Sequence, residues 1–384
     1  MSIKQTDERY IAHTYKRFDL AIVKGNGCLC WDDNGKEYID MTSGIGVNAF
    51  GYSDPVWADA VANQAKLLQH TSNLYYTAPC AELAEILCTR TGMSKVFFSN
   101  SGAEANECAV KIARKYAAQH KGAEYYNIIT LQKSFHGRTL TTLAATGQDN
   151  FHHDFLPLTD GFLYAEPNDT EGLQKLVKEN KVAGILIEIV QGEGGVNSLD
   201  ADYVRAVDAI CRENDIVLMV DEVQTGNGRT GKLYSYMHYG IQPDVVSTAK
   251  GLAAGLPMGA TLMSEKVSEV LGYGDHGSTF GGNPVCAAAA ISVMNRMDEA
   301  FLAEVAAKGQ YVRERVEAAG FAVSGMGLMI GIATRKPVSE VIAACMANGV
   351  LCLSAKEKLR LLPPLNIPTE QLTKAVDVIL EALK

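Results

Sequence analysis

The sequence predicts an α/β protein with a large domain built on a mostly parallel sheet and a small α+β domain at the carboxyl end. Short apolar runs, of which 216–220 is the clearest, are typical of strands buried on both faces of a parallel sheet. From about residue 301 the pattern changes to a helix, strands within 321–334, and helices at 337–348 and from 369 onward. With 384 residues, the chain exceeds one ordinary domain.

We expect three parts along the chain. Residues 1–50 form an N-terminal segment that packs with the small domain, residues 51–285 form the large domain, and residues 286–384 form the small domain. No internal repeat or low-complexity linker marks these boundaries. In the first part, 28–40 alternates apolar and polar residues and breaks at 33–35, which predicts a hairpin.

Composition and charge exclude several classes of partner. Hydrophobic residues make up 47% and charged residues 21% of the chain, which is ordinary for a globular protein. The formal net charge of −9 argues against nucleic acid or an anionic membrane as the main partner. No apolar run reaches the roughly 18 residues of a membrane span, and the first residues lack a signal sequence. We therefore expect a cytoplasmic protein.

The cysteines and histidines do not predict a metal site. Nine cysteines form an odd number without a Cys-x-x-Cys pair, which indicates reduced and mostly buried thiols. Three histidines, His136, His152 and His153, lie in one region, but no Cys, His or Asp spacing typical of a metal site accompanies them. We expect no bound metal.

Two residues at strand ends carry the functional prediction. The run 216–220 ends in Asp221, so a carboxylate lies at the carboxyl end of the sheet, where α/β folds bind ligands. A second strand over 244–248 leads to Lys250, which has a small residue on each side. Such a pair suits pyridoxal phosphate, because lysine holds its aldehyde as a Schiff base and a carboxylate keeps its ring nitrogen protonated. Taken singly, Asp221 is better explained as an N-cap or loop acid and Lys250 as a solvated lysine.

A phosphate site is predicted where strand 95–98 passes into a long helix. Ser101, Gly102 and Ala103 begin this helix, and their free backbone N–H groups and the positive end of the helix dipole attract phosphate. The alternative is a plain serine N-cap. Together with the downstream lysine, the phosphate interpretation is favoured.

The glycines of 226–231 match the pattern G-x-G-x-x-G, which could indicate a nicotinamide dinucleotide. The context does not support it. The preceding strand ends five residues before Gly226, no clear amphipathic helix begins at Gly231, and no suitable acid follows about 20 residues later. We therefore interpret these glycines as a loop and reject NAD.

The motifs of the chain resemble those of the class III aminotransferases. The resemblance lies in 221–231, 249–252 and 257–260, is closest to the acetylornithine and ornithine branch, and extends over nearly the whole chain. It implies fold type I of the transferases that depend on pyridoxal 5′-phosphate. It also implies that Lys250 and Asp221 are catalytic.

Further cofactor contacts follow from this resemblance. The segment 134–139 is similar to the family's Phe-x-Gly-Arg element, in which the aromatic residue, here Phe135, stacks on the cofactor ring. Val223 lies on the opposite face of the ring and Gln224 meets its phenolic oxygen. Ser278 and Thr279 reach the cofactor phosphate of a partner subunit, which implies a homodimer with shared active sites.

The resemblance also implies the substrate contacts. Arg138 holds a distal carboxylate, because guanidinium binds carboxylate in a bidentate manner; a surface salt bridge is the alternative. Arg360 binds the α-carboxylate of glutamate, and Glu193 neutralises that arginine when no α-carboxylate is bound; Glu193 could instead be a solvated loop acid. Tyr15 contacts substrate in relatives, although it could equally pack an N-terminal arm.

The implied reaction transfers the terminal amino group of N-acetylornithine to 2-oxoglutarate, giving N-acetylglutamate semialdehyde and glutamate, a step of arginine biosynthesis. Ornithine aminotransferases that resemble this stretch carry a tyrosine near Gly44, so the smaller residue here suggests room for an acyl group. The chain departs from its relatives at Ile189, usually proline, and at Ser324, commonly arginine. The alternatives are transamination of ornithine, succinylornithine, succinyldiaminopimelate or 4-aminobutyrate, and a protein that binds pyridoxal phosphate without turnover.

Overall fold

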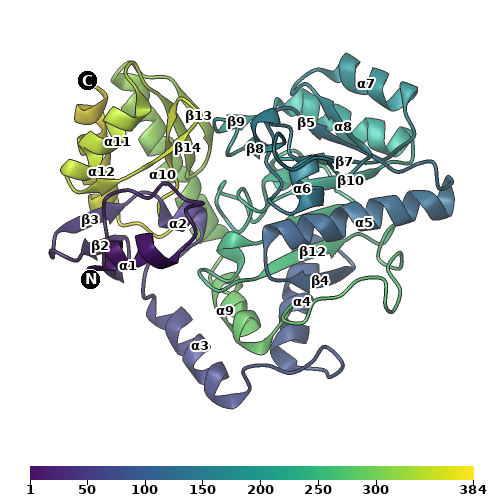
Figure 1. The fold of residues 1–384 in the computed structure, drawn as a ribbon, viewed down its shortest axis with the longest axis horizontal. Coiled ribbons are helices and arrows are strands. Elements are labelled where there is room, and N and C mark those ends of the chain that lie inside the picture. Colours follow the sequence, from purple (N-terminus) through teal and green to yellow (C-terminus); the bar gives the residue numbers. More distant parts are fainter.

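A seven-stranded sheet forms the centre of the larger part of the molecule in the computed structural model, which describes residues 1–384 (Figure 1). The strand order is β4-β12-β11-β10-β7-β5-β6. The bounds are β4 (Lys95–Ser99), β5 (Asn127–Leu131), β6 (Phe162–Ala165), β7 (Val182–Ile187), β10 (Val217–Asp221), β11 (Val245–Thr248) and β12 (Gly259–Met263). Only β12 runs antiparallel to its neighbours. The predicted α/β fold with a mostly parallel sheet is confirmed.

Helices cover both faces of this sheet, because its strands are apolar on both sides. Val217 and Met219 of β10 belong to the core cluster that contains the apolar residues of α5 (Gly102–His120). Leu218 and Val220 point to the other core, which contains residues of α4 (Ala78–Thr91), α7 (Thr170–Glu179) and α8 (Ala201–Glu213). The carboxyl ends of β5, β7, β10 and β11 therefore meet at one edge of a sheet that is shielded from water on both faces.

The small domain is α+β, as predicted. Its sheet has the order β13-β14-β17-β16. The elements are α10 (Glu299–Ala318), β13 (Val323–Met326), β14 (Met329–Ala333), α11 (Val338–Ala347), β16 (Leu353–Ala355), β17 (Lys358–Leu361) and α12 (Thr369–Leu383). Arg360 lies on β17 opposite Gly331 of β14, so its backbone is fixed on both sides by neighbouring strands.

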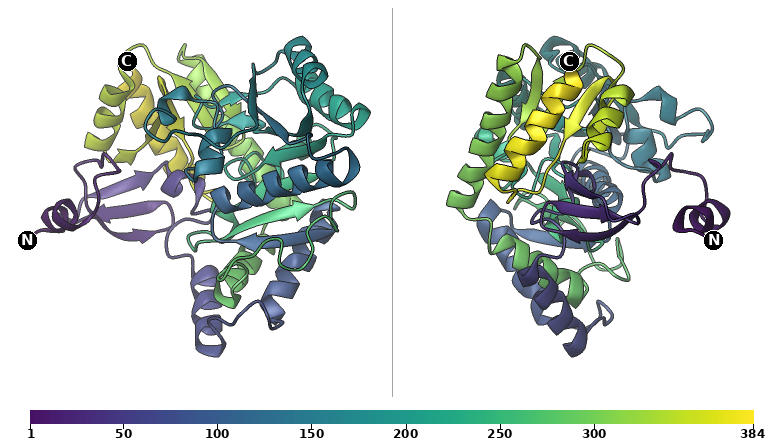
Figure 2. Two further views of the ribbon diagram at one scale, coloured as in Figure 1. Left: turned by 45° about the vertical axis from the view of Figure 1, so that its right-hand side comes forward. Right: turned by 90° about the vertical axis from the view of Figure 1, so that its left-hand side faces the viewer.

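The N-terminal segment shares a sheet with the carboxyl-terminal part of the chain. The order is β1-β2-β3-β15, with β1 (Ile22–Asn26), β2 (Leu29–Asp32), β3 (Glu37–Asp40) and β15 (Val350–Leu351). The hairpin predicted over 28–40 is formed by β2 and β3. The first helix, α1 (Ile3–Tyr10), has no buried residue and lies away from the rest of the molecule in both views of Figure 2.

The remaining helices lie mainly on the large domain. They are α2 (Ser43–Gly46), α3 (Pro55–Leu67), α6 (Leu140–Ala145), α9 (Pro284–Met294) and the 3₁₀ turns η1 (Asp149–Phe151), η2 (Ser235–His238) and η3 (Lys250–Leu252). The division at 285 and 286 stays a prediction, and it falls within α9, which packs against α3 and α4. None of the helices combines the length and the apolar character needed to cross a bilayer.

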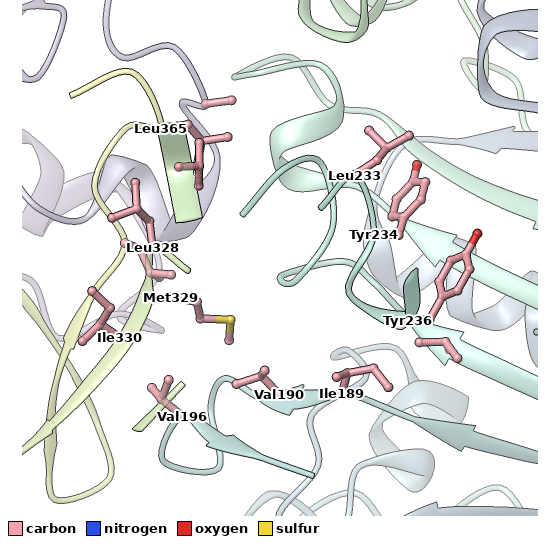
Figure 3. Packing of buried hydrophobic residues seen from close by; sticks show 14 of the residues in the cluster. Ile189, Val190, Val196, Leu233, Tyr234, Tyr236, Leu328, Met329, Ile330 and Leu365 are labelled. Carbon is pink, nitrogen blue, oxygen red and sulfur yellow. The ribbon is translucent and has the colours of Figure 1, made fainter. Parts of the chain in front are cut away.

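The two domains meet through a small apolar contact next to the sheet edge. Val196 lies in the tight turn between β8 (Val190–Gln191) and β9 (Asn197–Ser198), opposite Met329 and its neighbours on β14 (Figure 3). A side-chain carbon at Gly331 would lie 2.8 Å from the Cβ of Val196, so glycine is required there for the close approach. Ile189, one departure from the family pattern, is fully buried in the same cluster.

Candidate active site

Asp221 and Lys250 line one cavity of about 430 Å³ at the carboxyl edge of the large sheet. The two residues come together because β10 ends in Asp221 and pairs in parallel with β11, which ends two residues before Lys250. Other predicted residues that line this cavity are Ser101, Gly102, Ala103, Phe135, Arg138, Val223 and Gln224. The structure therefore places nine of the predicted site residues around a single space.

The carboxylate of Asp221 is buried and accepts three hydrogen bonds. Its Oδ2 lies 2.8 Å from Nδ1 of His136 and accepts a hydrogen bond of 2.7 Å from Nδ2 of Asn106. Its Oδ1 accepts a hydrogen bond of 2.9 Å from the backbone N–H of Val223. Since a carboxylate only accepts, Nδ1 of His136 carries the proton. These donors stabilise the charged form in a place where burial alone would disfavour it.

Asn106 and His136 are functional neighbours that the sequence did not reveal. Asn106 also donates to the backbone carbonyl of His136, and its own Oδ1 accepts from the hydroxyl of Ser247. The network thus joins α5, β11 and the loop after β5 around one carboxylate. From the sequence, His136 suggests at most a metal ligand; in the structure, no group of three or more His, Cys, Asp or Glu residues is arranged to hold a metal. The position of His136, a polar residue next to Phe135 in a loop at the end of a strand, could have indicated that it belongs to the site.

Lys250 is held in a constrained backbone conformation. Its φ of 45° lies in the left-handed region, which is unfavourable for a residue with a side chain. Nδ2 of Asn227 donates to the carbonyl of Ala249 and to Oγ1 of Thr248, at 3.0 and 2.9 Å, and so fixes the preceding residues. Burial lowers the pKa of Lys250, and the charges of Glu193 and Asp221 oppose this effect only in part.

The start of α5 has the features of a phosphate site. Ser101 is the N-cap, and its hydroxyl accepts a hydrogen bond from the backbone N–H of Glu104. Gly102 and Ala103 follow at the first helical positions, where backbone N–H groups have no partner within the helix. A side-chain carbon at Gly102 would lie 2.6 Å from Val223, so only glycine allows these two walls to approach. The donors and the apolar wall suit a phosphate attached to a flat ring.

Glu193 and Arg360 form a partly buried ion pair at 2.5 Å. The Nη1 of Arg360 also lies 3.3 Å from the carbonyl of Gly192 and from Oε1 of Gln224. Burial alone would raise the pKa of Glu193, but the charge and the hydrogen bond of Arg360 outweigh it, and the pKa is lowered. Gln224 links this pair to the cavity, because it contacts both partners and lines the cavity.

Five predicted residues do not line this cavity: Glu193 and Arg360, which form the ion pair beside it, and Ser278, Thr279 and Tyr15. Ser278 and Thr279 line a second cavity of about 480 Å³, and Asn100 lines both cavities and donates to the hydroxyl of Ser278. Tyr15 is 73% exposed on the N-terminal segment, beside Arg17. The roles predicted for these residues, like those of the residues that line the first cavity, stay predictions.

The glycine loop at 226–231 is not followed by a helix, in agreement with its interpretation as a loop. Its Arg229 is buried and donates to the carbonyls of Leu328 and Pro363, which belong to the small domain. The loop therefore joins the domains and leaves no helix N-terminus for a dinucleotide phosphate.

Comparison with known proteins agrees with this geometry. The family model described as "Aminotransferase class-III" matches residues 10–383. The acetylornithine aminotransferase of Haemophilus ducreyi is 50% identical over 385 residues, which cover 99% of this chain and 98% of the relative.

The chain is a class III aminotransferase.

Solved structures of this family share its fold. The ornithine aminotransferase of Toxoplasma gondii is 30% identical, with a TM-score of 0.95 and coverage of 99% of this chain and 94% of that one. The acetylornithine aminotransferase of Elizabethkingia anophelis is also 30% identical, with a TM-score of 0.88 and coverage of 99% and 97%. Class III aminotransferases depend on pyridoxal phosphate, so the predicted family, fold and cofactor are confirmed.

Glu188 is a buried acid that lines the cavity, and its raised pKa makes the stability of the protein depend on pH. Burial raises the pKa of Glu188 well above 4.5, and the charge of Asp221 adds to this, although the backbone N–H of Phe135 donates to its carboxyl group. Because the folded pKa is the higher one, protonated Glu188 stabilises the fold at low pH, and this stability is lost as the pH rises from 4.5 through the folded pKa. Glu188→Gln imitates the protonated acid and removes the loss.

We therefore expect cofactor-free Glu188→Gln to gain stability relative to the cofactor-free wild type as the pH rises from about 5 to about 8. Urea denaturation at several pH values measures the difference in the free energy of unfolding. A difference that stays constant over this range would contradict a neutral Glu188.

Proposed function

We propose that the protein is an N-acetylornithine aminotransferase, which transfers the terminal amino group of N2-acetylornithine to 2-oxoglutarate and forms N-acetylglutamate semialdehyde and glutamate. The proposal rests on one observation: of the two arginines at the site, only one has an ion-pair partner. Arg138 lines the cavity without an ion-pair partner, whereas Arg360 is neutralised by Glu193. The names of the relatives, at up to 50% identity over the full length, support the choice of donor.

The residues around the cavity would hold pyridoxal phosphate as follows. The N–H groups of Gly102 and Ala103 and the hydroxyl of Ser101 take the phosphate, while Phe135 and Val223 cover the two faces of the ring. When bound, pyridoxal phosphate supplies an aldehyde that receives the amino group and a ring that accepts electrons.

Asp221 and Lys250 have complementary tasks in this proposal. With the cofactor bound, the carboxylate of Asp221, which three hydrogen bonds hold in place, would keep a proton on the nitrogen of the ring. With the cofactor bound, the Nζ of Lys250 would accept the proton of the reacting carbon of the substrate and return it during the transfer. Its lowered pKa favours this task, because a neutral amine accepts protons near neutral pH. Gln224 meets the phenolic oxygen of the ring.

The two arginines explain how one site takes two unlike substrates. Arg138 binds the carboxylate of acetylornithine that lies far from the reacting amine. Acetylornithine presents no carboxylate beside that amine, so Arg360 stays paired with Glu193 and leaves no unpaired charge in the cavity. When glutamate or 2-oxoglutarate binds, its α-carboxylate replaces Glu193 as the partner of Arg360. The pair therefore acts as a switch between the half-reactions.

A homodimer is part of the proposal. Ser278 and Thr279 lie outside the cavity of their own chain. Tyr75, Tyr76 and Phe280 are exposed aromatic residues that a second copy of the chain would cover. In such a dimer Ser278 and Thr279 would complete the phosphate site of the partner, and Tyr15 would contact the substrate. Nine free thiols support a cytoplasmic location.

A donor panel tests the choice of substrate. With 2-oxoglutarate as acceptor, we expect kcat/KM to be highest for N-acetylornithine when it is compared with ornithine, succinylornithine, succinyldiaminopimelate and 4-aminobutyrate. Ornithine differs from N-acetylornithine by a free α-ammonium group, and 4-aminobutyrate lacks the acylated amine and the carbon that carries it. Preference for ornithine or 4-aminobutyrate would contradict the proposal.

Substitution of the lysine tests its covalent role. Lys250→Ala should retain pyridoxal phosphate through the phosphate contacts but lose turnover by at least about 10³-fold, because the group that moves the proton is gone. Borohydride reduction followed by mass spectrometry should attach the cofactor to the wild type and not to the variant. Normal turnover by Lys250→Ala would refute the assignment.

A further inference from the structure

The guanidinium group of Arg138 lies beside two aromatic rings. Its guanidinium carbon lies 4.3 Å from the centre of the Phe151 ring and 5.4 Å from the centre of the Phe135 ring. The two rings meet edge to face, with their centres 6.0 Å apart. Arg138 itself is exposed and lines the cavity beside Phe135. Phe151 contributes nothing else to the site, because it does not line the cavity.

The segment that carries Phe151 is fixed to the segment that carries Phe135. Phe151 is the last residue of η1, and its backbone N–H donates to the carbonyl of Gln148. The side-chain amide of Gln148 is buried and donates to the carbonyl of Ser134, one residue before Phe135.

Gly147 strengthens this attachment. Its backbone N–H donates to the hydroxyl of Ser134, and its carbonyl accepts from Lys133. A side-chain carbon at Gly147 would lie 2.1 Å from the carbonyl oxygen of Leu131, so the two segments touch directly. Phe151 is therefore a fixed point and not the tip of a loose loop.

We propose that Phe151 is a positioning residue that fixes the guanidinium of Arg138 for the distal carboxylate of the substrate and so contributes to donor specificity. The proposal rests on the proposed function, because it assigns a carboxylate to Arg138. A ring face attracts a cation without occupying its N–H groups. The donors of Arg138 thus stay free for a bidentate contact with the substrate.

The comparison with Arg360 shows why an aromatic support suits this position. Arg360 is held by the carboxylate of Glu193, which must leave before a substrate carboxylate can bind. Every substrate of the proposed reaction carries a carboxylate distant from the reacting carbon, so Arg138 needs no such competitor. Phe151 limits the motion of the guanidinium, which lowers the entropy lost when the substrate binds.

The test uses two amino donors that differ only in the carboxylate. N-Acetylornithine carries it, and N-acetyl-1,4-diaminobutane is the same molecule without it. Initial rates of the holoenzyme are measured with 2-oxoglutarate as acceptor, and kcat/KM is determined for each donor, because in a ping-pong reaction this value reports only the half-reaction with the donor. The ratio of the two values reports the carboxylate contact and cancels general damage to the site.

We expect Phe151→Leu to lower kcat/KM for N-acetylornithine by about tenfold, mainly through KM, and to change the value for the analogue by less than about twofold. Phe151→Tyr keeps the ring and should retain the wild-type ratio. Phe155→Leu is the matched control, since Phe155 is exposed in the same segment and the cation–π contacts of Arg138 are with Phe135 and Phe151. The melting temperature and the content of bound cofactor are measured for each variant.

The Arg138→Ala variant distinguishes failure of the positioning role of Phe151 from failure of the carboxylate contact of Arg138. If it collapses the ratio while Phe151→Leu leaves the ratio unchanged, Phe151 has no positioning role and this inference is overturned alone. If Arg138→Ala also leaves the ratio unchanged, the carboxylate contact of the proposed function is wrong as well. An equal loss with both donors in Phe151→Leu, or in a Phe151→Met variant if the first does not fold, would show a purely structural role and overturn the inference.

Discussion

The site depends on one buried carboxylate that the surrounding chain keeps charged. Asp221 is almost fully buried at the end of β10, where an isolated carboxylate would be costly. His136, Asn106 and the backbone of Val223 offset this cost with three hydrogen bonds. Because these donors come from the loop after β5, from α5 and from the segment after β10, the three hydrogen bonds form only when the sheet and its helix are assembled. Fold and chemistry are therefore linked at this residue.

At the same edge of the sheet, several ionisable groups have pKa values shifted in different directions. Burial raises the pKa of Glu188 and lowers that of Lys250, so both tend towards their neutral forms in the cofactor-free cavity. Glu193 is instead held in its charged form by Arg360, which the small domain delivers on β17. Shifts of this kind, with an acid raised, an amine lowered and a neighbouring acid lowered in pKa, are typical of sites that transfer protons.

Local sequence patterns predicted the framework well. The strand ending in Asp221 and the helix capped by Ser101 follow from apolar runs and capping chemistry that act within a few residues. The partners of Asp221 could not be predicted in this way, because His136 and Asn106 lie 85 and 115 residues away along the chain. The role of Phe151 could not be predicted for a similar reason, because its contact with Arg138 has no signature in the spacing of residues along the sequence. The family resemblance added roles for Arg360 and Glu193, and the structure brings these two residues together.

The central claim is that Asp221 is a carboxylate that holds a proton on the ring nitrogen of bound pyridoxal phosphate. Nitrogen-15 NMR of the holoenzyme, loaded with cofactor labelled at that nitrogen, measures this directly. We predict a protonated ring nitrogen in the wild type from about pH 6 to about pH 9, and its loss in Asp221→Asn. An unprotonated nitrogen in the wild type, or the same chemical shift in both proteins, would contradict the account.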